Sequence, residues 1–171
     1  MKLFFPLIWI TLHILAIGDS LTVGWPFEPG YVQYMPMPYE IQTCAQGGWT
    51  FEDALDIMPE CLESHPDLVL LWLGTNDDLQ GVWSTDQYNR ALEVIRMYAP
   101  GARVLVGALP EVPALPLASE HNQELLEAGY NLVPFALEDG DIWQDGLHLT
   151  DQGYRAVADD WRSAITQPSY R

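Results

Sequence analysis

Three residues far apart in the sequence carry the side chains of a nucleophilic catalyst. Ser20 follows the apolar run Ile14–Ile17 within the sequence Gly-Asp-Ser-Leu, and Asp145 precedes His148 by three residues. A serine hydroxyl needs a base to remove its proton, and a carboxylate can orient that base and stabilise its charged form. We therefore predict that Ser20 is a nucleophile, that His148 is its base, and that Asp145 holds the imidazole.

Two further segments supply candidate donors for a developing oxyanion. Gly-Gly-Trp-Thr begins at Gly47, and Gly-Thr-Asn-Asp begins at Gly74. Acyl transfer builds negative charge on an oxygen atom, and preorganised N–H groups stabilise that charge. We predict an oxyanion hole made of the backbone N–H groups of Ser20 and Gly48 and the side-chain amide of Asn76. If the backbone donor lies one residue earlier, Gly47 takes the place of Gly48 in the oxyanion hole.

Each of these side chains also has a purely structural interpretation. Ser20 after Gly-Asp is typical of a cap or turn, Asp145 before Gly is common in turns, and Asn76 suits an Asx turn. The neighbouring acids Asp19 and Asp77 are interpreted as acceptors that tie loops together. The pair at residues 77 and 78 has no further metal ligands nearby in sequence, so we expect no metal site.

Short apolar runs separated by amphipathic stretches predict alternating strands and helices. The runs are suited to buried parallel strands, and the connecting helices imply right-handed crossovers with helices on both faces of the sheet. The expected strands are Leu12–Ile17, Tyr39–Cys44, Leu68–Leu73, Arg103–Ala108 and Asn131–Phe135, and the expected helices are Thr50–Glu63, Thr85–Ala99, Ser119–Ala128 and one that begins at Thr150. Residues 24–38 are expected to form a loop with at most a short helix near Tyr31–Met35.

The composition is short of basic residues. A chain of 171 residues with 49% hydrophobic content suffices for one domain with one sizeable core. Seven Lys and Arg against 24 Asp and Glu give a formal net charge of −17. Such a surface repels phosphate backbones and anionic headgroups, so we expect neither nucleic acid nor an acidic membrane as a partner. Solubility or adaptation to salt explains the charge itself.

The N-terminus and the two cysteines leave the compartment open. Residues 1–11 begin like a signal peptide, but their apolar run continues directly into the first expected strand. We treat them as an apolar extension of a single domain over residues 12–171, and expect a cytoplasmic protein. A secreted chain or an N-terminal anchor is the alternative. Cys44 and Cys61 either form a disulfide in an oxidising compartment or are small buried side chains.

The four segments occur in the order of a known family. Gly18-Asp19-Ser20-Leu21 and the segments that begin at Gly47, Gly74 and Asp145 resemble the Ser, Gly, Asn and His blocks of the GDSL or SGNH hydrolases. This resemblance implies a flavodoxin-like α/β/α sandwich with a five-stranded parallel sheet. It also implies esterase, lipase, thioesterase or carbohydrate deacetylase chemistry without a cofactor.

We therefore predict a hydrolase of small, short-acyl esters that works through an acyl-Ser20 intermediate. The alternatives are a carbohydrate O-acetyl esterase and a non-catalytic flavodoxin-like module that binds a ligand. A phosphate-binding domain ranks last, because its glycine-rich motifs are absent from the sequence and the net charge opposes anions. Trp49 and Trp143 adjoin the proposed catalytic blocks and are weak candidates for substrate contacts.

Overall fold

A computed structural model describes residues 11–35 and 38–167 of the chain. Five parallel strands form one sheet in the order β2-β1-β3-β4-β5. The strands are β1 (Leu12–Gly18), β2 (Tyr39–Ala45), β3 (Leu68–Trp72), β4 (Arg103–Gly107) and β5 (Leu132–Val133). This topology confirms the predicted α/β fold. The proposed extension, apart from Thr11, lies outside the described residues.

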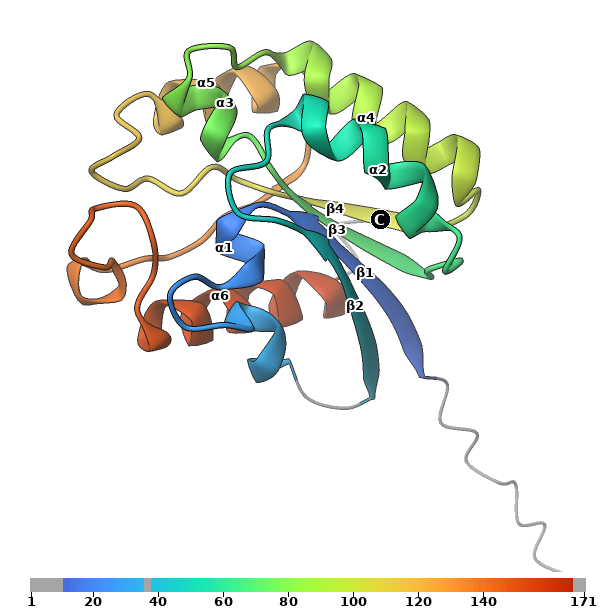
Figure 1. The fold of residues 1–171 in the computed structure, drawn as a ribbon, viewed down its shortest axis with the longest axis horizontal. Coiled ribbons are helices and arrows are strands. Elements are labelled where there is room, and N and C mark those ends of the chain that lie inside the picture. Colours follow the sequence, from blue (N-terminus) through green and yellow to red (C-terminus); the bar gives the residue numbers. More distant parts are fainter. Residues whose placement is uncertain (1–10, 36–37, 168–171) are drawn as a thin grey trace, which may run out of the picture.

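Helices cover both faces of the sheet, so that the molecule has three layers (Figure 1). The helices α2 (Phe51–Leu62), α4 (Thr85–Tyr98) and α5 (Ala118–Glu127) cover one face, whereas α6 (Asp151–Thr166) covers the other. Alternate residues of a strand point to opposite faces. Accordingly, Leu15 and Ile17 pack under α2, and Ile14 and Ala16 pack with α6.

The predicted long helices are present, and their ends follow local capping. Thr50 accepts a hydrogen bond from the Asp53 N–H, while the Asp53 side chain accepts one from the Thr50 N–H, which fixes the start of α2. Thr150 caps α6 through the Gly153 N–H. Four short helical segments were not among the predicted long helices: α1 (Ser20–Val23), η1 (Gly30–Tyr34), α3 (Thr75–Leu79) and η2 (Asp139–Asp141). Only η1 corresponds to a predicted short helix.

Cys44 at the end of β2 and Cys61 in α2 form a disulfide, with a Cα–Cα distance of 6.0 Å. The bond joins a strand to the helix that follows it and settles which of the two interpretations of the cysteines holds. Disulfides persist mainly in oxidising compartments. Among the described residues, no helix is long and apolar enough to cross a membrane.

Removing this disulfide should lower stability without changing the fold. The two cysteines are 17 positions apart, and closing a loop of this length restricts the unfolded chain by about 3 kcal/mol. We expect the Cys44→Ala/Cys61→Ala variant to lose roughly 2–4 kcal/mol of unfolding free energy in urea. Adding reductant should weaken the wild type similarly and leave the variant unchanged. Equal stability of the two proteins would contradict the structural role of the bond.

Candidate active site

Ser20 lies at the carboxyl end of β1, where the sheet order reverses between β1 and its neighbours. The chain goes from β1 to β2 on one side and returns to β3 on the other, and such switch points hold ligand sites in open α/β sheets. Asp19 caps α1, and its Oδ1 accepts a hydrogen bond from the Leu21 N–H at 2.9 Å. Ser20 therefore begins the short helix and turns its side chain toward the edge of the sheet. Its exposed fraction is 8%.

His148 joins Ser20 to Asp145 through both of its ring nitrogens. The imidazole Nε2 lies 2.9 Å from the Ser20 Oγ, and Nδ1 lies 2.7 Å from the Asp145 Oδ2. Nδ1 carries the proton in this arrangement, because a carboxylate only accepts hydrogen bonds. Nε2 is then free to accept the serine proton. The three side chains thus form a continuous chain of hydrogen bonds over 128 residues of sequence separation.

The Asp145 carboxylate is held by its own turn. Its Oδ1 accepts hydrogen bonds from the backbone N–H groups of Leu147 and His148 at 3.0 and 2.9 Å. Partial burial raises the pKa of Asp145, but these bonds and the one from the imidazole outweigh it, so the net pKa lies below the ordinary value. The carboxylate is consequently charged at neutral pH and oriented toward Nδ1.

Asn76, in the short helix α3, and Gly48, in the loop after β2, line the same cavity as Ser20. The Asn76 Nδ2 donates one hydrogen bond to the Trp49 carbonyl oxygen at 2.9 Å, which fixes the orientation of the amide. Its second N–H is left for another acceptor. Gly48 has a φ of +86°, a backbone conformation that favours glycine. Gly47 lies next to it, where an added Cβ would be 3.8 Å from the Ser20 Cβ. All three residues line one cavity with Ser20.

Asp77, which lies next to Asn76 in α3, ties this short helix to the segment that follows Gly48. Its carboxylate accepts hydrogen bonds from the Phe51 N–H at 3.1 Å and from the Gln87 side chain at 2.7 Å. Burial raises the pKa of Asp77, and these hydrogen bonds partly oppose that effect. The interpretation of Asp77 as an acceptor between loops is confirmed.

The cavity beside Ser20 is open to solvent and has a volume of about 400 Å³. Its lining combines polar groups with apolar side chains, among them Trp25 and Leu147. Its lining consists of Ser20, Val23, Trp25, Glu28, Gly47, Gly48, Asn76, Asp145, Leu147 and His148. The sequence segments predicted to form one site therefore converge on one hollow.

Comparison with known proteins identifies the family of the chain. The sequence pattern of the GDSL-like lipase/acylhydrolase family matches residues 16–156. The chain belongs to this family. An arylesterase from Vibrio mimicus is 27% identical to this hydrolase, over 85% of the chain and 84% of the relative.

Solved structures show the same fold. A family 3 carbohydrate esterase from Clostridium thermocellum superposes with a TM-score of 0.75 at 22% identity, covering 90% of this chain and 94% of that one. The acetyl xylan esterase AlAXEase gives a TM-score of 0.70 at 23% identity, over 90% of this chain and all of that one.

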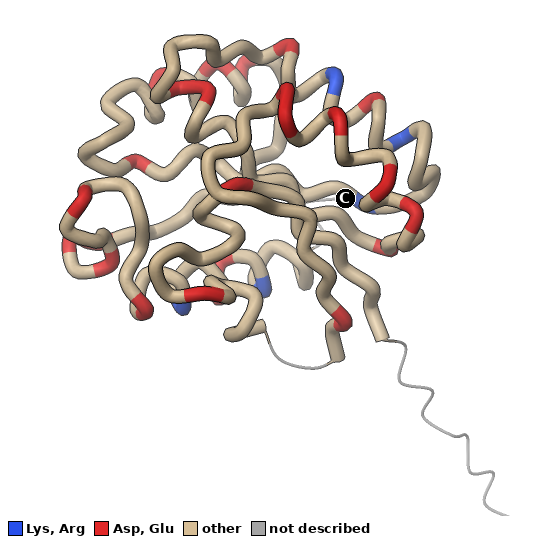
Figure 2. The backbone as a smooth tube through the Cα atoms, viewed as in Figure 1, with Lys and Arg blue, Asp and Glu red and all other residues tan. Residues whose placement is uncertain are grey.

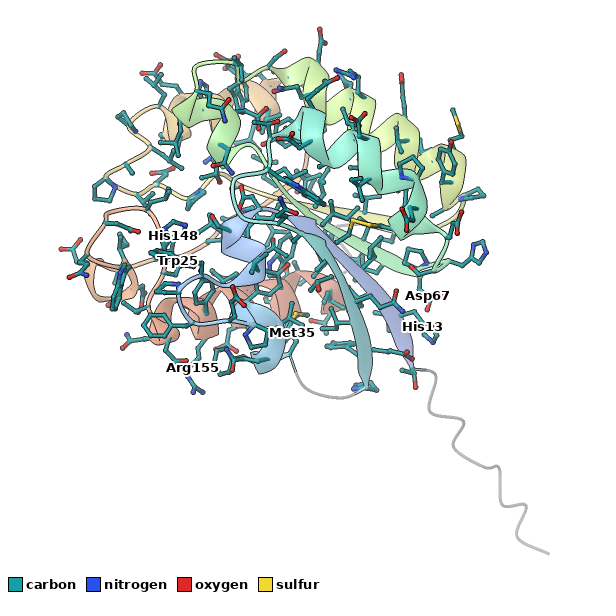
Figure 3. All side chains as sticks on the ribbon, viewed as in Figure 1. His13, Trp25, Met35, Asp67, His148 and Arg155 are labelled. Atoms are coloured by element: carbon teal, nitrogen blue, oxygen red, sulfur yellow. A yellow bond between two sulfur atoms is a disulfide. The ribbon has the colours of Figure 1, made fainter. Side chains whose placement is uncertain are left out.

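The sequence favoured Trp49 and Trp143 as substrate contacts, and neither is among the residues that line the cavity beside Ser20. Trp25 lines the cavity, and its ring centroid lies 4.6 Å from that of His148 in an edge arrangement (Figure 3). Trp49 packs against the core beside α2, and Trp143 contacts Phe27. Trp25 lies in a loop rich in Pro and Gly, where no periodicity in the sequence reveals the direction of a side chain.

Asp19 gives the hydrolase a pH-dependent stability. Burial raises the pKa of this carboxyl from 3.8 to about 7, against the opposing hydrogen bond from Leu21. Between these two values the unfolded chain is ionised while the folded chain keeps the proton. The contribution of this carboxyl to the stability of the folded state is therefore fully present at a pH below the lower pKa. It is lost as the pH rises through about 7.

Asp19→Asn should remove this dependence, because the amide cannot ionise but retains an acceptor for the Leu21 N–H. We expect the unfolding free energy of the variant, relative to wild type, to increase by about 2–4 kcal/mol between acid and mildly alkaline pH. Urea denaturation across this range measures the difference. Asp56→Asn, at an exposed position of α2, is the matched control. If the difference in unfolding free energy between Asp19→Asn and the wild type stayed constant with pH, the raised pKa of Asp19 would be contradicted.

Proposed function

We propose that the chain is a serine esterase that cleaves small, short-acyl esters through an acyl-Ser20 intermediate. The observation that supports this most directly is the hydrogen-bonded chain from Ser20 through His148 to Asp145 at the wall of the cavity. Family membership supports hydrolysis of an ester or related acyl bond.

The first half of the proposed reaction transfers the acyl group to the enzyme. His148 Nε2 takes the Ser20 proton as Oγ forms a bond to the ester carbonyl carbon. The negative charge on the carbonyl oxygen is stabilised by the N–H groups of Ser20 and Gly48 and the free N–H of Asn76. As the carbon–oxygen bond to the leaving group breaks, the imidazolium gives its proton to the alcohol.

The second half uses the same groups with water in place of serine. His148 removes a proton from water as the water oxygen attacks the acyl carbon, and it then returns that proton to the Ser20 oxygen. Asp145 remains ionised throughout and stabilises the imidazolium at Nδ1. These steps release a carboxylic acid and restore the free enzyme without any cofactor.

The size of the cavity supports a short acyl group. A space of about 400 Å³ must hold both the acyl group and part of the alcohol, and it opens to water. A long alkyl chain would keep most of its surface in solvent and gain little from burial. Acetylated sugars are a second candidate class, since the exposed Trp25 ring in the cavity lining suits a sugar face.

A panel of p-nitrophenyl esters tests the proposal. We expect kcat/KM for the acetate to exceed that for the laurate by roughly tenfold or more, because the cavity can enclose only a short acyl chain. Acetylated xylose measured alongside tests the second candidate class, and the Ser20→Ala variant gives the background rate. A preference for laurate would contradict the acyl length, and equal rates for wild type and Ser20→Ala would contradict the mechanism.

A further inference from the structure

The segment from Gly24 to Gly30, called here the Trp25 loop, closes on itself beside the catalytic cavity. The Phe27 N–H donates to the Gly24 carbonyl oxygen at 2.6 Å, and the Gly30 N–H donates to the Phe27 carbonyl oxygen at 3.1 Å. A Cβ on Gly24 would lie 2.0 Å from the Gly30 backbone, and both glycines have positive φ. Only glycine permits the two ends to meet so closely.

Contacts from two other segments hold this loop in place. The Tyr154 hydroxyl of α6 donates a hydrogen bond to the Trp25 carbonyl oxygen at 2.8 Å. The Phe27 ring meets the Trp143 ring edge-on, with centroids 5.1 Å apart. The loop is thereby joined to α6 and to the segment that leads to His148. The loop is consequently held in one position, and its side chains form a preorganised wall of the cavity.

Trp25 and Glu28 are the side chains that this loop contributes to the wall together with Val23. Trp25 is 45% exposed although its ring contacts His148, so part of its surface is available to a ligand. Within the described part of the chain, the Glu28 carboxylate has no ion-pair partner. Asp145, the other acid in the lining, is already hydrogen-bonded to His148.

The loops around the cavity carry negative charge only. Segments 18–30, 45–50, 73–84, 108–117 and 134–150 lie at this edge of the sheet, and their sequences contain no Lys or Arg. Figure 2 shows acidic positions without basic ones along the loops at the far left of the view. The basic residues of the described chain lie on α4, at the start of β4 and on α6: Arg90, Arg96, Arg103, Arg155 and Arg162.

We propose that the cavity selects esters that carry a cationic group, a quaternary or protonated amine, which binds between the Trp25 ring and the Glu28 carboxylate. An indole face and a carboxylate both attract such a cation, and the negative edge of the molecule concentrates it near the cavity. Anionic esters are disfavoured by the same field. The inference rests on the proposed esterase function and adds the charge class of its substrate.

A pair of substrates with the same shape isolates the charge. Acetylthiocholine has a quaternary nitrogen where 3,3-dimethylbutyl thioacetate has a carbon atom. At low ionic strength we expect wild-type kcat/KM to be roughly tenfold higher for the cationic ester, the combined size of an exposed cation–π contact and an exposed ion pair. The preference should decrease as salt is added, because salt screens exposed charges.

Substitutions in the loop should reduce this preference. Glu28→Gln removes the charge at nearly constant shape and should lower the ratio to about threefold, and Trp25→Leu should lower it similarly. Glu111→Gln, on another acidic loop of the same edge but outside the cavity lining, is the matched control and should keep the wild-type ratio. A wild-type ratio near or below one, or a ratio equally reduced by Glu111→Gln, would overturn the proposal.

A binding measurement separates this inference from the proposed function. Calorimetric titration of Ser20→Ala with acetylcholine and with 3,3-dimethylbutyl acetate requires no turnover. Tighter binding of acetylcholine, weakened by Glu28→Gln in the same background, would support charge selection even if the wild type hydrolysed neither ester. Equal affinity for both compounds would overturn charge selection, while an active wild type would leave the esterase function standing.

Discussion

Replacing Ser20 with alanine should lower kcat for p-nitrophenyl acetate by about 10⁵-fold or more, because no other hydroxyl among the described residues is hydrogen-bonded to the His148 Nε2. The residual rate reflects binding and the remaining oxyanion donors acting on water. Initial rates followed by the absorbance of the released nitrophenolate, at mildly alkaline pH, provide the measurement.

The matched control for this prediction is Ser119→Ala, an exposed position at the start of α5. It should keep wild-type activity, and circular dichroism should show the same fold for both variants, since removal of one hydroxyl leaves the core intact. Wild-type activity in folded Ser20→Ala protein would show that Ser20 is not the nucleophile.

The second large effect is expected for Asp145→Asn, which should lower kcat by about 10⁴-fold. The amide oxygen can still accept the hydrogen bonds from the Leu147 and His148 backbone, so the turn is preserved. Its NH₂ group, however, faces the imidazole Nδ1 and donates to it. The ring proton then moves to Nε2, where it prevents the imidazole from accepting the Ser20 proton.

Asp139→Asn, an exposed acid in the same segment, is the control for the charge change alone. It should have close to wild-type kcat when both variants are assayed with p-nitrophenyl acetate over a range of pH. A loss of less than tenfold for Asp145→Asn would mean that the carboxylate does not orient His148, whatever its distance in the structure.

The strands were predictable because a strand that is buried on both faces consists of consecutive apolar residues. Runs such as Leu68–Leu73 are wholly apolar, and β3 is buried along its whole length. The last strand is shorter than predicted, Leu132–Val133 against Asn131–Phe135, since Pro134 has no N–H to extend the pairing. The helix α3 was missed because five largely polar residues after Gly74 give no helical period.

The sequence predicts site residues only where the chemistry requires a particular type of side chain. Ser20 and His148 could be proposed as nucleophile and base because these roles require particular side chains, here in an order known from a family, and the structure places the two side chains within hydrogen-bond distance. The places of Trp25 and Glu28 in the cavity lining could not be predicted, because they depend on the path of the loop, which the Tyr154 hydroxyl holds from α6. The Cys44–Cys61 pairing was left open for a similar reason, since two cysteines do not reveal their own separation in space.

Mass spectrometry of the enzyme during turnover tests the central claim most directly. Rapid acid quenching with p-nitrophenyl acetate in excess, followed by peptide mapping, locates any acyl group on the chain. We predict a mass increase of one acetyl group on the peptide that contains Ser20, absent from Ser20→Ala and greatly reduced in His148→Ala. Turnover with the acetyl group on another residue, or with an equal yield of adduct in Ser20→Ala, would contradict the account.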